Sequence, residues 1–221
     1  MSHDQPNFPV RDIGISTRSV TGRVPSLGKY ESTLERDLME ILRFDPDIER
    51  FTPQPLTIEY SDQNGKLRSY TPDGLIHFKS ILSLYITPIL YEVKYRADFR
   101  KDWKTLLPKF RAAKAYCLNH GWRFQVFTER EIRTPYLNNV KFLWPYLNQT
   151  PSSEKKIQIL QILSDLDEAD PDLLLCALCN DPMNRARMIP SLWHLIGIGA
   201  IGCDLNIPLT MRSRIWAKES C

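Results

Sequence analysis

The sequence predicts a mixed α/β domain followed by a smaller, mostly helical domain. Three observations lead to this fold class. Apolar residues recur at helical spacing over residues 32–44 and 100–119. Strand-like segments with a strong turn lie between and after these two helices. Residues 152–221 return to helical spacing with almost no strand pattern. The order helix, hairpin, strand, helix, strand is typical of a sheet covered by helices.

The chain begins with a polar segment and then forms its first predicted helix. Residues 1–28 show no periodicity and carry several arginines, so we expect a flexible basic arm. In residues 32–44, one face is apolar, formed by Leu34, Leu38, Ile41 and Leu42. Ser32 and Glu35 have the spacing of a capping box, and Asp45-Pro46 ends the helix.

Strands are predicted on both sides of a short turn. Residues 56–60 alternate between apolar and polar, and Asp62-Gln63-Asn64-Gly65 favours a hairpin whose return strand runs to Asp73. Further strands are expected at residues 89–95 and 122–127. The helix between them, residues 100–119, has a predicted buried face that consists of Trp103, Leu106, Leu107, Phe110 and Ala113.

A linker at residues 149–153, Gln-Thr-Pro-Ser-Ser, divides the chain into two predicted domains. The first covers residues 29–150 and the second residues 151–221. Of 221 residues 43% are hydrophobic, and no apolar run approaches the ~20 residues of a membrane span. The first residues do not resemble a signal peptide, so we expect a cytoplasmic protein. The chain has no Gly-rich phosphate loop, so we expect it to bind no nucleotide.

Cysteine and histidine give weaker signals. Cys176 and Cys179 form a CxxC, but the surrounding LLLCALCN favours buried free thiols over a zinc half-site. His194 lies in an apolar helix and is interpreted as a hydrogen-bonded core histidine.

Charge is unevenly distributed, although the net charge is only +3. Residues 94–114 carry eight Lys or Arg against two Asp, whereas residues 165–181 carry six acidic side chains and no basic one. The basic stretch fits either phosphate contact or a solvated helix face. Our hypothesis is that it holds a DNA backbone through Arg96, Arg100, Lys101 and Lys104. The acidic stretch suggests that the second domain docks a protein partner.

The residues with the strongest chemical signal stand at strand ends. Asp73 lies in Thr-Pro-Asp-Gly, where a strand meets a constrained turn. Glu92 and Lys94 share one face of the strand at residues 89–95, because side chains alternate, and Val93 then points into the core. Two carboxylates and an ammonium group at one point suit phosphodiester hydrolysis with Mg²⁺. An exposed Glu–Lys pair of no chemical role is the alternative.

Several segments in order resemble the TnsA family, the endonuclease subunits of heteromeric Tns-type transposases. They are GKYESTLERDLMEILRFDP, QPLTIEY, GKLRSYTPDG, YEVKYRADF and GWRFQVFTEREIR. The resemblance covers about residues 28–145. It implies a restriction-endonuclease-like mixed sheet flanked by helices and a C-terminal domain of winged-helix-like type. It also implies cleavage of the 5′ strands at transposon ends in a bacterial cell. The implied partners are a TnsB-type transposase and a TnsC-type ATPase.

The resemblance also assigns roles to residues. Asp73, Glu92 and Glu35 become ligands of Mg²⁺, or of Mn²⁺ in its place, and Lys94 positions water or stabilises charge. Glu31, one turn before Glu35, is the other candidate for the helical carboxylate, and a capping role is the structural alternative for Glu35. Gly74 departs from the bulkier apolar residue that the family often has there. A non-catalytic assembly subunit and a stand-alone restriction or repair nuclease remain as alternative functions.

Overall fold

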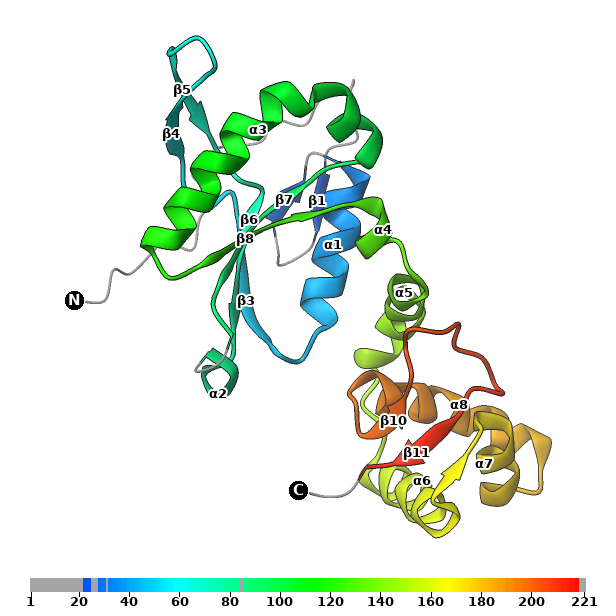
Figure 1. Ribbon diagram of the computed structural model, residues 1–221. Helices are drawn as coiled ribbons and strands as arrows, with labels where there is room; N and C mark the ends of the chain where they lie inside the picture. Colours follow the sequence, from blue (N-terminus) through cyan, green and yellow to red (C-terminus); the bar gives the residue numbers. More distant parts are fainter. Residues whose placement is uncertain (1–21, 25–27, 31, 84–85, 219–221) are drawn as a thin grey trace. The chain divides into compact units, whose positions relative to one another are not determined.

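The computed structural model describes residues 22–24, 28–30, 32–83 and 86–218. The chain divides into two compact units, Met1–Ile132 and Arg133–Cys221 (Figure 1). The division lies earlier than the predicted boundary at residue 150. The predicted linker at residues 149–153 instead joins two helices of the second unit, α5 (Pro135–Leu147) and α6 (Ser153–Leu166). Contacts explain this difference, because α5 packs on α8 (Pro182–Gly197), with the Phe142 and Trp193 rings edge to face.

Most of the predicted flexible arm, residues 1–21 and 25–27, lies outside the described residues. Two pieces near its end form backbone strands, β1 (Gly22–Val24) and β2 (Gly28–Tyr30), which pair in antiparallel fashion. The predicted arm, residues 1–28, therefore includes one short strand, Gly22–Val24, and the first residue of the next.

A four-stranded mixed sheet forms the centre of the first unit. Its order is β3-β6-β7-β8, with bounds Ile48–Pro53, Gly74–Phe78, Ile89–Val93 and Arg123–Phe127. The pairs β3–β6 and β6–β7 are antiparallel, whereas β7 and β8 are parallel. Parallel neighbours need a crossover, and helix α3 (Arg96–Asn119) provides it. The predicted mixed α/β fold is confirmed.

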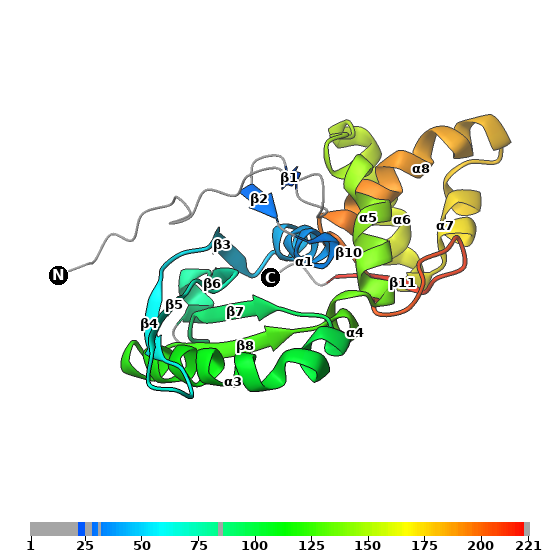
Figure 2. The same ribbon diagram turned by 90° about the horizontal axis from the view of Figure 1, so that it is seen from above.

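Helices cover both faces of this sheet (Figure 2). On one face, Ile89, Tyr91 and Val93 pack against helix α1 (Thr33–Phe44) through the buried side chains Leu34, Leu38 and Leu42. On the other face, Leu90 packs with residues of α3, namely Ala113 and Cys117. The alternation of β7 therefore sends Glu92 to the α3 side, and Val93 points into the core as predicted.

The hairpin is present but ends earlier than predicted. Strands β4 (Ile58–Ser61) and β5 (Leu67–Tyr70) form a separate two-stranded ribbon, and Gly65 in its turn has a φ of +74°. Pro72 has no N–H to donate to a ladder, so the chain leaves the hairpin after Tyr70 and enters the central sheet at Gly74. Asp73 therefore stands at the start of a strand and not at the end of one.

Helix α3 begins at Arg96, four residues before its predicted start, and its first part is exposed. Every residue from 96 to 105 is exposed, and burial begins at Leu106. Trp103 was predicted on the buried face, but 47% of it is exposed. We call residues 96–105 the projecting segment of α3.

The second unit has the order of elements of a winged-helix domain after α5. Helix α6 is followed by β9 (Glu168–Ala169), α7 (Pro171–Leu178), α8, β10 (Ile201–Cys203) and β11 (Ile215–Ala217). The three strands form an antiparallel sheet in the order β10-β11-β9.

Two short helices complete the first unit, α2 (Ser80–Ser83) and α4 (Glu129–Ile132). Of all the helices described, none combines the length and apolarity needed to cross a bilayer.

The predictions for the histidine and the two cysteines of the second unit have different outcomes. His194 is buried, and its Nδ1 lies 2.9 Å from the Tyr146 carbonyl oxygen, which confirms a hydrogen-bonded core histidine. Cys176 and Cys179 are free thiols, but Cys176 is exposed and Cys179 half-buried, so the predicted burial is wrong. The guanidinium of Arg185 donates to Cys176 Sγ at 2.9 Å.

Candidate active site

Strands β6 and β7 place two carboxylates next to each other. Gly74 pairs with Tyr91 in the register, so the preceding Asp73 lies opposite Glu92. Asp73 Oδ2 accepts a hydrogen bond from the Val93 N–H at 2.7 Å. The Asp73 carbonyl oxygen accepts another from the Gln54 N–H at 2.9 Å. Both ends of the residue are thus fixed by neighbouring strands, which orients the carboxylate.

Glu92 is buried on the α3 side of the sheet, with 6% of its surface exposed. Its Oε2 accepts a hydrogen bond of 2.7 Å from the hydroxyl of Tyr70, the last residue of β5. The hairpin therefore reaches the central sheet through this bond. A buried carboxylate held by one donor retains acceptor capacity for a further ligand.

The local electrostatics are unfavourable for two negative charges. Burial raises the pKa of Asp73 well above its ordinary value, and the charges of Glu92 and Glu35 raise it further. Burial also raises the pKa of Glu92, against the lowering effects of the Tyr70 hydrogen bond and of Lys94 and Lys109. A bound cation would stabilise the ionised form of both carboxyls, because its positive charge offsets their desolvation and their mutual repulsion.

Lys94 and Glu35 lie close enough to this pair to act on it. Lys94 follows β7, is half-buried, and donates its N–H to the Phe127 carbonyl oxygen at 3.0 Å. Its charge lowers the pKa of both Asp73 and Glu92. Glu35 is in the first turn of α1, where its N–H donates to Ser32 Oγ at 3.1 Å, as capping predicts. Its charge also acts on both carboxyls, so four predicted residues share one electrostatic neighbourhood. Glu31 lies outside the described residues.

The carboxylates can contribute to a metal site but do not enclose one. Within the described ranges, no three or more His, Cys, Asp and Glu side chains are grouped so that they could hold an ion. Mg²⁺ usually binds one or two carboxylates and keeps water or phosphate oxygens in its other positions. Asp73 and Glu92 fit that pattern as a pair of oxygen ligands.

The four residues predicted to contact DNA lie on the projecting segment of α3. Arg96, Arg100, Lys101 and Lys104 are all exposed. The Arg96 N–H donates to Glu129 Oε2 at 2.9 Å, which gives the helix an acceptor at its first turn. Two aromatic side chains stand among these cations, Phe99 at 37% and Trp103 at 47% exposed. Exposed aromatic and basic side chains together are typical of nucleic-acid surfaces.

Sequence reasoning missed two residues at the site, Tyr70 and Lys109. Tyr70 ends a strand of another sheet, and Lys109 is one of eight basic residues in its stretch. Lys109 Nζ lies 5.9 Å from the centroid of the Tyr70 ring. Both contacts join segments far apart in the sequence, so no local pattern could have identified them.

Tyr91 is a third residue that the sequence did not single out, and it is buried. Its ring lies against Gly74, because a Cβ at position 74 would be only 2.3 Å from Tyr91 Cζ. Its hydroxyl is buried and has no hydrogen-bond partner in the described part of the chain. The ring also meets Phe127 edge to face, with centroids 6.0 Å apart.

Comparison with known proteins gives one positive result. A comparison with curated proteins found no match. Residues 45–129 match the model of the TnsA-like endonuclease N-terminal domain. The matched range includes β3, β6, β7, α3 and β8 together with Asp73, Glu92 and Lys94. The resemblance found in the sequence is thereby confirmed over residues 45–129, the part of the first unit that is similar to a TnsA-like endonuclease domain.

Proposed function

We propose that the protein is a Mg²⁺-dependent DNA endonuclease that cuts the 5′ strands at transposon ends. It would act with a TnsB-type transposase and a TnsC-type ATPase, the partners that the family resemblance implies. The observation that carries the proposal is the pair Asp73 and Glu92, opposite each other on β6 and β7, with Lys94 just beyond, inside a TnsA-like endonuclease domain.

The raised pKa values of the two carboxyls support a cation at this place. Asp73 and Glu92 would hold Mg²⁺ or Mn²⁺, with Glu35 as a third carboxylate beside them. When bound, such an ion polarises the phosphoryl group and lowers the pKa of a bound water. Tyr70 holds Glu92 in orientation through its 2.7 Å hydrogen bond. The ammonium of Lys94 stabilises charge that develops on the phosphate oxygens.

The projecting segment of α3 supports DNA as the substrate. It begins two residues after Lys94, so its cations stand next to the site along the chain. Four Lys or Arg against Asp98 and Asp102 give residues 96–105 a net charge of +2. Phosphate contacts from such a segment position a duplex without reading its sequence. Recognition of the transposon end would then rest with the transposase.

The test is strand-specific cleavage of a labelled transposon-end duplex, with Mg²⁺ or EDTA, with and without the partner transposase. The native protein should cut the 5′ strand only with metal and partner. Asp73→Ala should lower the rate by at least about a hundredfold, because it removes one of two ligands of the ion. Glu49→Ala, which changes an exposed carboxylate on β3, is the matched control and should cut as the native protein does.

Other outcomes correspond to other functions. Cutting at a short defined sequence without any partner indicates a stand-alone nuclease. Assembly with transposase and DNA, but no cutting that depends on Asp73, indicates a non-catalytic subunit. Either result would overturn the proposal.

A further inference from the structure

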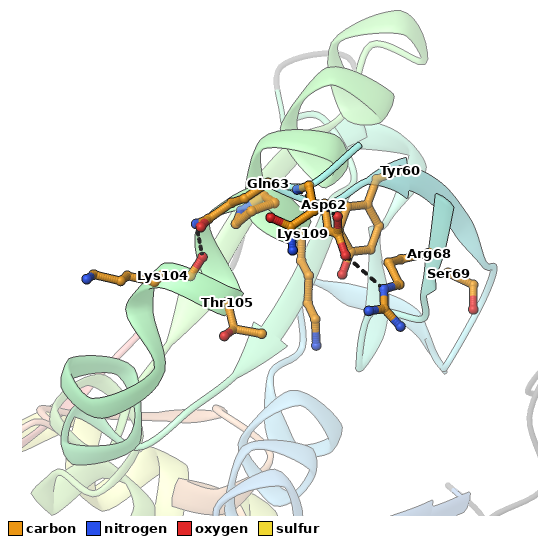
Figure 3. A pocket seen from close by; sticks show the side chains of 10 residues that line it. Tyr60, Asp62, Gln63, Arg68, Ser69, Lys104, Thr105 and Lys109 are labelled. Carbon is orange, nitrogen blue, oxygen red and sulfur yellow. Dashed lines mark hydrogen bonds and ion pairs between the residues drawn. The ribbon is translucent and has the colours of Figure 1, made fainter. Parts of the chain in front are cut away.

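A cleft of about 450 Å³ lies between the β4–β5 hairpin and α3 (Figure 3). The hairpin forms one wall with Asp62, Gln63 and Arg68, and α3 forms the other with Lys104 and Lys109. Gln63 ties the walls together, because its Nε2 donates to the Lys104 carbonyl oxygen at 2.8 Å. The cleft is therefore a fixed feature of the first unit, formed by segments about 40 residues apart in sequence.

The charges that line this cleft are mostly positive. Arg68, Lys104 and Lys109 face a single acidic residue, Asp62, so the lining has a net charge of +2. Asp62 is already engaged, since it accepts hydrogen bonds from the Arg68 Nε at 3.0 Å and from two backbone N–H groups of the turn. Neither lysine forms an ion pair within the described part of the chain. The cleft thus offers the ammonium group of Lys109 to an anionic ligand, and that of Lys104 stands at its outer end.

The inner end of the cleft adjoins the candidate active site. Lys109 lies on the α3 wall with its Nζ 5.9 Å from the centroid of the Tyr70 ring. The Tyr70 hydroxyl donates to Glu92. One tyrosine side chain therefore separates the cleft from a carboxylate of the site. At the outer end, Figure 3 shows Lys104 extending away from the hairpin, and Lys104 also belongs to the projecting segment.

We propose that this cleft binds the sugar–phosphate backbone of the DNA strand beside the cut, with Lys109 and Lys104 as phosphate contacts. The inference rests on the proposed function and adds a subsite to it. Charge complementarity selects the ligand, because a DNA strand offers one phosphate every ~3.4 Å. Continuity supports it too, since the cleft runs from Lys104 of the projecting segment to Lys109, next to the tyrosine that bonds Glu92. Gln63, Ser69 and Thr105 add the neutral polar groups that commonly accompany phosphate contacts.

The first test is the salt dependence of duplex binding, measured by fluorescence anisotropy without divalent cations. Lys109→Gln and Lys104→Gln should each reduce the slope of log K against log salt by about 1, because each removes one phosphate contact. Two exposed lysines outside the cleft serve as controls, Lys114 on α3 and Lys66 in the hairpin turn. Lys114→Gln and Lys66→Gln should leave the slope unchanged. Equal slopes in all four variants would overturn the inference.

Binding is the deciding measurement because Lys109 also acts on Glu92, so a change in cleavage by itself does not separate the two roles. Cleavage by the native protein tests the proposed function independently. If the native protein cuts and the cleft variants bind with native slopes, the cleft inference fails and the function stands. If the native protein never cuts, the function fails. Melting temperatures of all variants show whether each one is folded.

A second, positional test uses disulfide crosslinking. Ser69→Cys places a thiol in the cleft lining. It should crosslink to a duplex that carries a thiol tether on a phosphate next to the cut. It should not crosslink to a duplex with the same tether more than a helical turn away. The native protein, which has its own cysteines, gives the background. Crosslinking at the distant tether and not at the near one would place the strand elsewhere and overturn the inference.

Discussion

Buried polar side chains have different surroundings in the two units. In the second unit, Asn139 is 4% exposed and uses its whole amide group. Its Nδ2 donates to two carbonyl oxygens, those of Leu205 at 2.9 Å and Ile207 at 2.7 Å, and its Oδ1 accepts from the Leu209 N–H at 2.9 Å. In the first unit, the buried Glu92 and the half-buried Asp73 lie close to each other as like charges. The Asn139 amide satisfies the backbone groups of a loop, whereas the carboxylates of Asp73 and Glu92 repel each other.

This difference distinguishes a polar side chain that stabilises the fold from carboxylates whose placement the fold does not need. A satisfied polar group fixes one conformation and contributes to the folded state. Two buried carboxylates weaken the folded state unless a cation or protons compensate them. Local conflicts of this kind are expected at functional sites. The comparison therefore supports the β6–β7 end as the site of the proposed reaction, at a cost in stability of the folded state.

The largest expected effect is a loss of stability when the hydrogen-bonded Asn139 is replaced. Asn139→Leu leaves two carbonyl groups and one N–H of the loop at residues 205–209 without their partner. Because each unpaired buried group costs about 1–3 kcal/mol, we expect the free energy of unfolding to fall by about 3 kcal/mol. Urea unfolding followed by circular dichroism measures it. Asn138→Leu changes an exposed neighbour and should alter stability by less than about 0.5 kcal/mol. A similar loss in both variants would contradict the structural role of Asn139.

The next effect, at Asp73, is a gain of stability. Burial raises the folded-state pKa of Asp73 above its ordinary value of 3.8, so the native protein loses stability as pH rises from about 4 through the raised pKa. Asp73→Asn removes this titration and keeps an acceptor for the Val93 N–H. Its advantage should be smallest near pH 4, grow as pH rises, and amount to on the order of 1 kcal/mol, or about 2–4 °C in Tm.

The same pair of proteins tests the metal. Without divalent cations, Asp73→Asn should melt above the native protein at neutral pH. Added Mg²⁺ should raise the Tm of the native protein and leave that of the variant nearly unchanged. Equal stability of the two proteins from pH 4 to 8, with no response to Mg²⁺, would show that Asp73 carries no buried charge of this kind.

An effect of similar size, on the rate of cleavage, is expected at Tyr70, whose hydroxyl bonds the buried Glu92. Tyr70→Phe removes the hydrogen bond to Glu92, a bond to a charged group worth about 1.5–3 kcal/mol. Because that bond lowers the pKa of Glu92, its loss should move the acidic limb of the pH–rate profile for cleavage to higher pH. We expect the rate at pH 7 to fall about tenfold. An unshifted acidic limb would mean that Tyr70 only packs against its neighbours.

The smallest effect is expected at Tyr91, the matched phenol on the opposite face of the sheet. Its buried hydroxyl has no partner among the described residues, so Tyr91→Phe should raise the free energy of unfolding by up to about 1 kcal/mol. Thermal unfolding without metal measures the change. A clear loss of stability would reveal a hydrogen bond that the hydroxyl makes in solution.

Elements with strong local signals could be predicted from the sequence. Helix α1 has an apolar stripe and an N-cap, and the hairpin has its turn residues. Strand β7 is apolar, and its alternation places Glu92 on the face opposite Val93. The family resemblance added Glu35, whose charge does act on Asp73. These features depend on spacing within one element, and the sequence contains that spacing directly.

Features that depend on distant contacts could not be predicted. Strand β3 was missed because IERFTP has no clear alternation and acquires its order by pairing with β6. The exposure of Trp103 was missed because an apolar stripe is buried only where another element covers it. Lys109 and Tyr70 became recognisable only through the distance between them. The roles of the metal and DNA residues stay predictions.

The contact between Gly74 and Tyr91 has a consequence for how this protein can diverge. No side chain fits at position 74 while the tyrosine ring covers it, so the two positions share one fixed volume. A relative with a bulky residue at position 74 would need a small residue at position 91. The two substitutions would then have to arise close together in evolution, since either intermediate is overfilled or hollow. The identities of residues 74 and 91 should therefore change together among relatives of this protein.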